Sequence, residues 1–164
     1  MKLTLALLTT LLLVAGQAFA IEPEAKIIAQ AGAPLTITSY SAAYQMGGRY
    51  TTEGIQHNVE YKNTGDKPVV AVQIGLVSFD VWNEFLDRSG GVSIEEVEPG
   101  ASMKGTWVAR AYAVSFLTGV AYVSKVRFAD GTIWAADLDA VAEELRKIEK
   151  DFDVMKLKGK PEKE

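Results

Sequence analysis

Residues 55–80 carry the clearest pattern of hydrophobic and polar positions in the chain. Apolar and polar side chains alternate from Ile55 to Tyr61, which predicts a strand with one face on a core and the other in water. Residues 68–79 are apolar at nearly every position, which is typical of a central strand covered on both faces. The intervening NTGDKP is rich in turn-forming residues, so we expect these two strands to form a hairpin.

Further runs rich in β-branched and aromatic residues predict additional short strands. They lie at residues 35–44, 85–87, 92–97, 102–109, 120–129 and 132–136, with Ser89-Gly90-Gly91 expected to separate the second from the third. Asp130-Gly131 lies between two alternating runs and predicts a hairpin. About seven strands at regular spacing predict an immunoglobulin-like antiparallel β-sandwich over residues 35–136. A small β-barrel is the alternative.

The hydrophobic period changes at Asp137, whose side chain is expected to cap a helix. Apolar residues then recur at helical spacing, which predicts an amphipathic C-terminal helix over residues 137–152. The members of this stripe are Leu138, Val141, Ala142, Leu145, Ile148 and Phe152. The stripe is expected to pack on the sandwich, on a second copy of the chain or on another partner, so self-association through the helix stays open. Residues 153–164 are strongly charged and are expected to form a disordered tail.

The first twenty residues have the order of a secretory signal peptide. Lys2 supplies the positive charge, residues 3–14 form a short apolar run, and Ala18-Phe19-Ala20 matches the small-x-small cleavage pattern. The apolar run is shorter than the roughly 20 residues that a membrane span needs, so no transmembrane segment is expected after cleavage. We therefore expect a periplasmic or secreted protein. Residues 21–34 form a lead-in, either extended or with a short helical turn.

Composition narrows the classes of function. Without residues 1–20 the chain has 16 basic and 21 acidic residues, a net charge of −5, which argues against a nucleic-acid partner. The chain contains no cysteine, so it has neither disulfides nor thiolate metal sites. Its length suits one domain with a substantial core.

Two stretches resemble a known family. NTGDKPVVAVQIGLVSFD and EPGASMKGTW are similar to segments of bacterial exported immunoglobulin-like domains of the FxLYD type, over roughly residues 55–110. The chain departs from the family pattern at Phe79-Asp80-Val81 and in its C-terminal helix. The resemblance implies a binding or accessory role and supplies no catalytic residues.

Few residues suggest catalysis or metal binding. His57 is the only histidine, it falls on the apolar side of the alternating strand, and no G-x-S-x-G motif is present, so we expect a packed side chain. The acids Asp80, Glu84 and Asp87 flank Trp82-Asn83, but their spacing does not match a calcium-binding loop. We therefore assign no catalytic residue, metal ligand or cofactor.

The apolar segment 110–119 is the strongest candidate for a contact surface. It contains one charge and lies between two predicted strands, so its aromatic residues Tyr112 and Phe116, with Trp82 in another connection, are the expected partner-binding residues. The alternative is that these side chains fold back over the end of the sandwich. We hypothesise an exported, non-catalytic module that binds another exported protein or an envelope component. The alternative function is a carbohydrate-binding or hydrolase accessory domain that uses the loop of residues 82–87.

Overall fold

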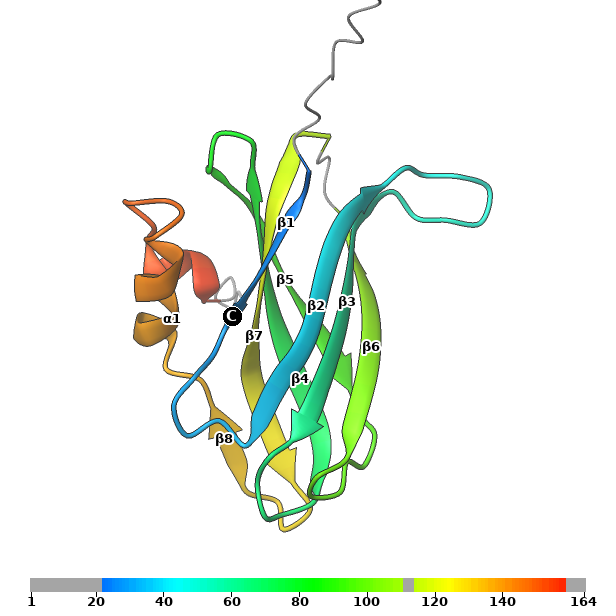
Figure 1. Ribbon diagram of the computed structural model, residues 1–164, viewed down its shortest axis with the longest axis vertical. Helices are drawn as coiled ribbons and strands as arrows, with labels where there is room; N and C mark the ends of the chain where they lie inside the picture. The colour runs from blue at the N-terminus through cyan, green and yellow to red at the C-terminus, as the bar shows by residue number, and fades with distance from the viewer. Residues whose placement is uncertain (1–21, 111–113, 159–164) are drawn as a thin grey trace, which may run out of the picture.

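Strands make up most of the molecule. The computed structural model describes residues 22–110 and 114–158. In chain order the elements are β1 (Glu24–Ile28), β2 (Leu35–Gln45), β3 (Gly54–Asn63), β4 (Val69–Asp80), β5 (Phe85–Ser93), β6 (Ser102–Ala109), β7 (Phe116–Phe128), β8 (Ile133–Ala135), α1 (Leu138–Leu145) and the 3₁₀-helix η1 (Val154–Leu157). Figure 1 shows the strands along the long axis in two layers, with α1 on the outside of one layer.

The strands form two sheets that pack face to face. One is five-stranded, with the order β1-β7-β4-β5 and with β8 also paired to β7, and the other is three-stranded, with the order β2-β3-β6. The prediction of a mainly β, sandwich-like protein with one C-terminal helix is confirmed, and the described strands do not close into the alternative small barrel. An entirely antiparallel sheet was the wrong expectation. The lead-in contains β1, which pairs in parallel with β7, so the larger sheet is mixed.

The two strands of residues 55–80 do not pair with each other. β3 lies between β2 and β6, whereas β4 lies between β5 and β7 in the other sheet. The turn after Asn63 therefore crosses between the layers, and the buried Asn63 amide holds the crossing by donating hydrogen bonds to the carbonyls of Lys67 (2.9 Å) and Val97 (2.8 Å). The hairpin prediction is wrong here because turn residues fit a crossing between layers as well as they fit a hairpin.

The glycines of β5 do not break that strand, contrary to the expectation from Ser89-Gly90-Gly91. β5 pairs with β4 from Phe85 to Ser93. At Gly91 a Cβ atom would lie 2.2 Å from the ring of Trp107, so close packing between the sheets requires glycine there. The second predicted turn is confirmed: Asp130-Gly131 joins β7 to β8, and Gly131 has the left-handed φ of +85°.

The main core lies between the sheets, where the predicted faces of the strands meet. The inward positions of β3 are buried as the alternation predicted, and β4 is buried on both faces. The buried members of this core are Leu35, Ile37, Val59, Tyr61, Val69, Val72, Ile74, Leu76, Val97, Ala121, Val123 and Val126. Because β4 and β7 are covered on their second face as well, they are the central strands of the molecule.

The C-terminal segment covers the second face of the larger sheet. Asp137 caps α1 as predicted, since its carboxylate accepts hydrogen bonds from the N–H groups of Asp139 (3.0 Å) and Ala140 (3.3 Å). The buried stripe of α1 packs with Val77, Phe79, Val120 and Tyr122 of the sheet. The apolar face of the helix is therefore occupied within one chain.

The C-terminal segment differs in two ways from its sequence prediction. α1 ends at Leu145 instead of residue 152, because the chain turns back and buries Phe152 against the rings of Phe79 and Phe85. The tail predicted from residue 153 is wrong for Val154–Leu157, which form η1 with Leu157 buried. The predicted signal peptide and residues 159–164 lie outside the described residues. Neither helix of the described chain is long and apolar enough to span a membrane.

Candidate functional site

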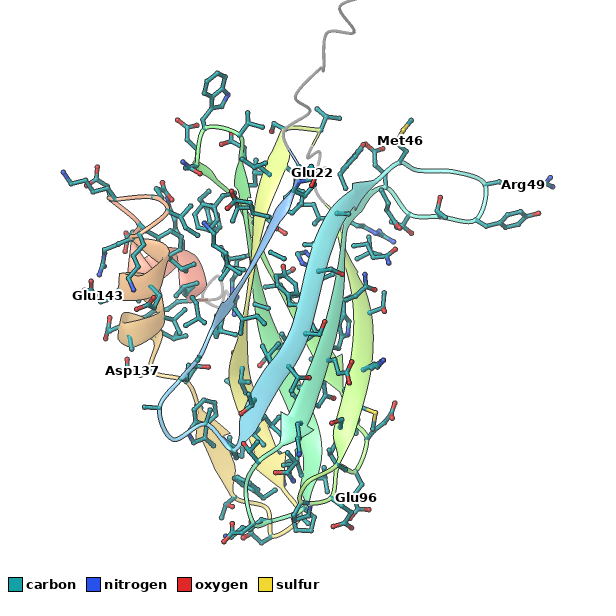
Figure 2. All side chains as sticks on the ribbon, viewed as in Figure 1. Glu22, Met46, Arg49, Glu96, Asp137 and Glu143 are labelled. Carbon is teal, nitrogen blue, oxygen red and sulfur yellow. The ribbon has the colours of Figure 1, made fainter. Side chains whose placement is uncertain are left out.

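Three connections at one end of the molecule, residues 46–53, 81–84 and 114–115, carry exposed apolar side chains and are here termed the loop end. Figure 2 shows Met46 and Arg49 on the connection that projects furthest from the sheets, at the end opposite Glu96. The large exposed apolar residues of the loop end are Met46, Tyr50, Val81, Trp82 and Val114. Since connections between strands commonly carry binding residues, this end is the candidate functional site.

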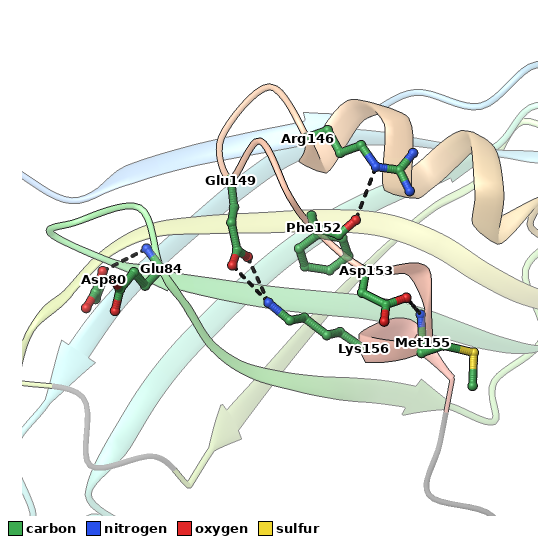
Figure 3. A network of polar contacts seen from close by, with 8 residues as sticks. All are labelled: Asp80, Glu84, Arg146, Glu149, Phe152, Asp153, Met155 and Lys156. Carbon is green, nitrogen blue, oxygen red and sulfur yellow. Dashed lines mark hydrogen bonds and ion pairs between the residues drawn. The ribbon is translucent and has the colours of Figure 1, made fainter.

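Trp82 stands on a turn between β4 and β5 that Asp80 holds in place. One carboxylate oxygen of Asp80 accepts hydrogen bonds from the backbone N–H groups of Trp82 and Glu84, each at 2.9 Å, and Figure 3 shows the second of these. Asn83 completes the turn in the left-handed region with φ 62°. The turn leaves the indole of Trp82 77% exposed, so the structure presents this predicted site residue to solvent.

A neighbouring connection lies against this turn. The backbone N–H of Val81 donates a hydrogen bond of 2.9 Å to the carbonyl of Ser115, and Val114 beside it is 85% exposed. The hydrogen bond brings residues 81–84 and 114–115 together although they are far apart in the sequence. Trp82 and Val114 consequently belong to one end of the molecule and stand on connected backbone.

Phe116 is not a surface residue, so its assignment as a contact residue is wrong. It is the first residue of β7, is 7% exposed, and clusters with the buried Ala42 and Ile55. The predicted connection 110–119 is thus too long at its C-terminal side, because an aromatic residue at the start of a strand can close the end of the core. Tyr112, the other expected contact residue of this segment, lies outside the described residues.

The connection between β2 and β3 is mostly polar in sequence and projects from the sheets. It presents Tyr50, 87% exposed, and Met46, 77% exposed. Its base is tied by the Tyr44 hydroxyl, which donates to Glu53 at 2.6 Å. The guanidinium of Arg49 lies 5.4 Å from the centre of the Tyr50 ring. In the sequence, Met46 and Tyr50 stand out as apolar residues in a polar segment. Their exposure follows only from the structure, in which the loop projects from the sheets.

His57 lies inside the molecule, as predicted. It is fully buried, its ring stacks on that of Tyr40, and His57 Nδ1 shares a hydrogen bond of 2.9 Å with the Tyr40 hydroxyl. Burial disfavours the charged imidazole and lowers the pKa of His57 from 6.5 to about 4. Burial also raises the pKa of Tyr40. The pair is therefore a neutral contact of the interior and has no access to a substrate.

The acidic residues near Trp82 are not grouped as metal ligands among the described residues. Asp80 is 8% exposed and accepts the two backbone hydrogen bonds of the turn. Across residues 22–110 and 114–158, no three side chains of the histidine, cysteine, aspartate or glutamate types are grouped to hold a metal ion. What the loop end offers chemically is apolar and aromatic surface on hydrogen-bonded turns.

Comparisons with known proteins give a likeness of fold alone. The sequence matches no protein-family model and no curated protein. A hypothetical protein from Peptoclostridium difficile 630 has a TM-score of 0.53 at 10% identity, with 73% of this chain and 93% of that chain covered. A putative ApaA protein from Bordetella pertussis has a TM-score of 0.38 at 12% identity, covering 71% and 90% of the two chains. The chain is thus similar in fold to an uncharacterised protein, and no family is assigned to it.

Proposed function

We propose that this protein is an exported, non-catalytic binding module that contacts another exported protein or an envelope component through its loop end. The observation that carries the proposal is the exposed indole of Trp82 on a turn held by Asp80. A large aromatic ring in water adds nothing to the protein's own core, whereas such rings supply much of the binding energy at interfaces. A turn fixed by hydrogen bonds reduces the entropy lost when a partner covers it.

The finer assignment to an immunoglobulin-like sandwich is part of this proposal. In the lettering of immunoglobulin domains, β2-β3-β6 take the order A-B-E and β5-β4-β7-β8 take the order C′-C-F-G, with β1 as an added N-terminal strand. The stretch that resembles the FxLYD type, roughly residues 55–110, spans β3 to β6. Domains of this architecture gather their connections at two ends and bind through them, which supports a role for the loop end.

Export is the second component of the proposal and rests on the leader sequence. Cleavage after Ala20 would give an N-terminus at Ile21, three residues before Glu24, where β1 begins to pair with β7. Mass spectrometry of the protein from periplasmic and culture fractions should find this N-terminus. Full-length chain confined to the cytoplasm would overturn the localisation.

The binding role is tested with Trp82→Ala. The variant should fold with a free energy of unfolding within about 0.5 kcal/mol of the wild type, because the side chain is exposed. Chemical cross-linking in the envelope fraction, followed by mass spectrometry, should recover a specific protein with the wild type and lose it with the variant. Ile133→Ala is the matched control, since Ile133 is also exposed and lies in β8, away from the loop end. Equal recovery by all three proteins would contradict the proposal.

A carbohydrate-binding or hydrolase accessory role is the second candidate. The exposed Trp82 and Glu84 stand together at the tip of the β4–β5 turn, and an aromatic ring beside polar groups can bind the face of a sugar ring. A glycan array separates the two candidates. Binding that is kept by Trp82→Phe and lost by Trp82→Ala supports the sugar-binding role. Absence of glycan binding, with specific cross-linking to a protein, supports the first candidate.

A further inference from the structure

A depression of about 320 Å³ lies on the outer face of the five-stranded sheet, beside the C-terminal segment and separate from the loop end. Its positively charged lining residues are Arg88 of β5, Lys125 of β7 and Lys158 just after η1. Among residues 22–110 and 114–158 no acidic residue lines it, although the chain as a whole has a net charge of −4. A hollow lined by three cations and no anion in an acidic protein favours negatively charged ligands.

Arg88 has no counter-ion in the described part of the chain. Six ion pairs within 4.0 Å occur there, and none includes Arg88. The Nε atom of Arg88 is shielded from solvent and has no hydrogen-bond partner among these residues. A buried donor without an acceptor costs free energy, which a bound anion would recover through the fork of the guanidinium group.

A second buried polar atom lies close to this guanidinium. The hydroxyl of Tyr122 is also shielded from solvent. Burial raises the pKa of Tyr122, while the charge of Arg88 and hydrogen bonding to the side chains of Arg88 and Ser124 oppose that rise, so these groups are neighbours. The side chains of Gln73 and Ser124 line the same depression and add an amide and a hydroxyl that can hydrogen-bond to an anion.

Gly75 makes room for the ring of Tyr122. Gly75 of β4 lies directly opposite Gly90 of β5, two residues from Arg88. A Cβ atom at Gly75 would lie 2.6 Å from the Tyr122 hydroxyl and even closer to the ring, so the ring occupies the space of the absent side chain. The glycine therefore lets the Tyr122 ring lie flat against β4, while Ala135, Ala136 and Leu138 form an apolar wall of the depression.

We infer that this depression is a binding site for a small amphiphilic anion, with a carboxylate or phosphate head against Arg88 and a short apolar body against Ala135 and Leu138. The charge of the lining selects the head, and the apolar wall selects a ligand with an apolar part over a fully hydrated ion. Lys125 and Lys158 are more exposed and add attraction at the rim.

The inference is tested by titrating the full chain with hexanoate and hexyl phosphate in heteronuclear NMR. Saturable shifts are expected in the amides of Arg88 and Ser124 and at the Arg88 Nε–H, in the millimolar range or below. Hexanol serves as the neutral probe of matched length and should not produce them. A tighter affinity for one of the two anions identifies the preferred head group. Absence of saturable shifts at these positions with both anions would overturn the inference.

Substitutions of Arg88 test whether the anion binds in this depression. Arg88→Gln should weaken binding by about tenfold or more because it removes a charge-assisted pair, and Arg88→Lys should weaken it less because it keeps the charge without the fork. Arg127→Gln, an exposed arginine of β7 outside the lining, is the control and should bind as the wild type does. If Arg88→Gln does not fold, Arg88→Lys decides, and affinity equal to that of the wild type contradicts the inference.

Carboxylates of the chain itself are the remaining alternative to an added anion as the ligand of Arg88. Residues 159–164 follow Lys158 and contain Glu162 and Glu164. The double variant Glu162→Gln, Glu164→Gln should bind the anions at least as tightly as the wild type does. If the double variant shifts the Arg88 resonances while added anions do not, the cations serve these glutamates and the inference is overturned.

Discussion

The two faces of the five-stranded sheet are both covered, but by different means. The inner face meets the second sheet across a continuous apolar core, built from strands that are distant in the sequence. The outer face is covered by one local segment, residues 137–158, which packs on Val77, Phe79 and Tyr122. That cover is incomplete and leaves the hollow around Arg88 open at its side. The difference suggests that the inner core holds the fold together while the outer cover shapes a surface.

Aromatic packing is what attaches the outer cover. The rings of Phe79, Phe85 and Phe152 lie with their centres 5.9–6.4 Å apart. The ammonium of Lys156 lies 5.1 Å from the Phe85 ring centre and 5.3 Å from that of Phe152, and it pairs with Glu149 at 2.9 Å. Figure 3 shows this ion pair beside Phe152. The cover therefore depends on a few side chains, which can be removed one at a time.

The largest effect is expected from Phe152→Ala. The side chain is 1% exposed and touches two other rings, so its loss should lower the free energy of unfolding by about 3–5 kcal/mol. Urea unfolding monitored by circular dichroism measures this loss. Met155→Ala, exposed on η1, is the control and should change stability by no more than about 0.5 kcal/mol. A Phe152→Ala effect as small as that of the control would mean that the outer cover contributes nothing to folding.

The contribution of the interior to stability can be tested by varying the pH, because His57 is buried there. The pKa of His57 is 6.5 when unfolded and about 4 when folded, so between these values the unfolded chain binds a proton that the folded protein does not. Stability is therefore complete above pH 6.5 and falls as the pH drops towards about 4. The shift corresponds to a loss of about 3 kcal/mol.

The measurement compares urea unfolding of the wild type and His57→Gln over this pH range. Glutamine does not titrate there, so the difference between the two proteins isolates the imidazole from the carboxylates. The difference should shrink as the pH falls. Parallel pH profiles would show that the buried contact with Tyr40 does not govern stability in acid.

The smallest effect is expected from Lys156→Met, which keeps an apolar stem against the rings and removes the charge. The ion pair with Glu149 is half-buried and two rings face the ammonium, so the loss should be about 1 kcal/mol and should decrease with added salt. Lys147→Met is the control, because its pair with Glu144 is more exposed and should contribute less. Equal losses in both variants would show that the rings add nothing to the Lys156 contact.

The sequence by itself determined most of the elements and several of their faces. The alternation around His57 correctly placed that residue in the interior, and the apolar run of β4 correctly predicted a strand buried on both sides. Asp130-Gly131 and Asp137 marked a hairpin and a helix start correctly. These features depend on neighbouring residues and on period, so they can be read from a local stretch of chain.

Only the tertiary structure decided which strands pair, which glycines lie within strands, and where the open surfaces are. The turn after Asn63 crosses between the sheets because β3 pairs with β2 and β6, whereas β4 pairs with β5 and β7. No local stretch of the sequence identifies these partners. Gly91 and Gly75 are dictated by the rings of Trp107 and Tyr122, which arrive from other strands. Phe116 closes the core while Trp82 remains in water, although both are aromatic residues near strand ends. Burial is a property of what surrounds a residue after folding, and the local pattern does not contain it.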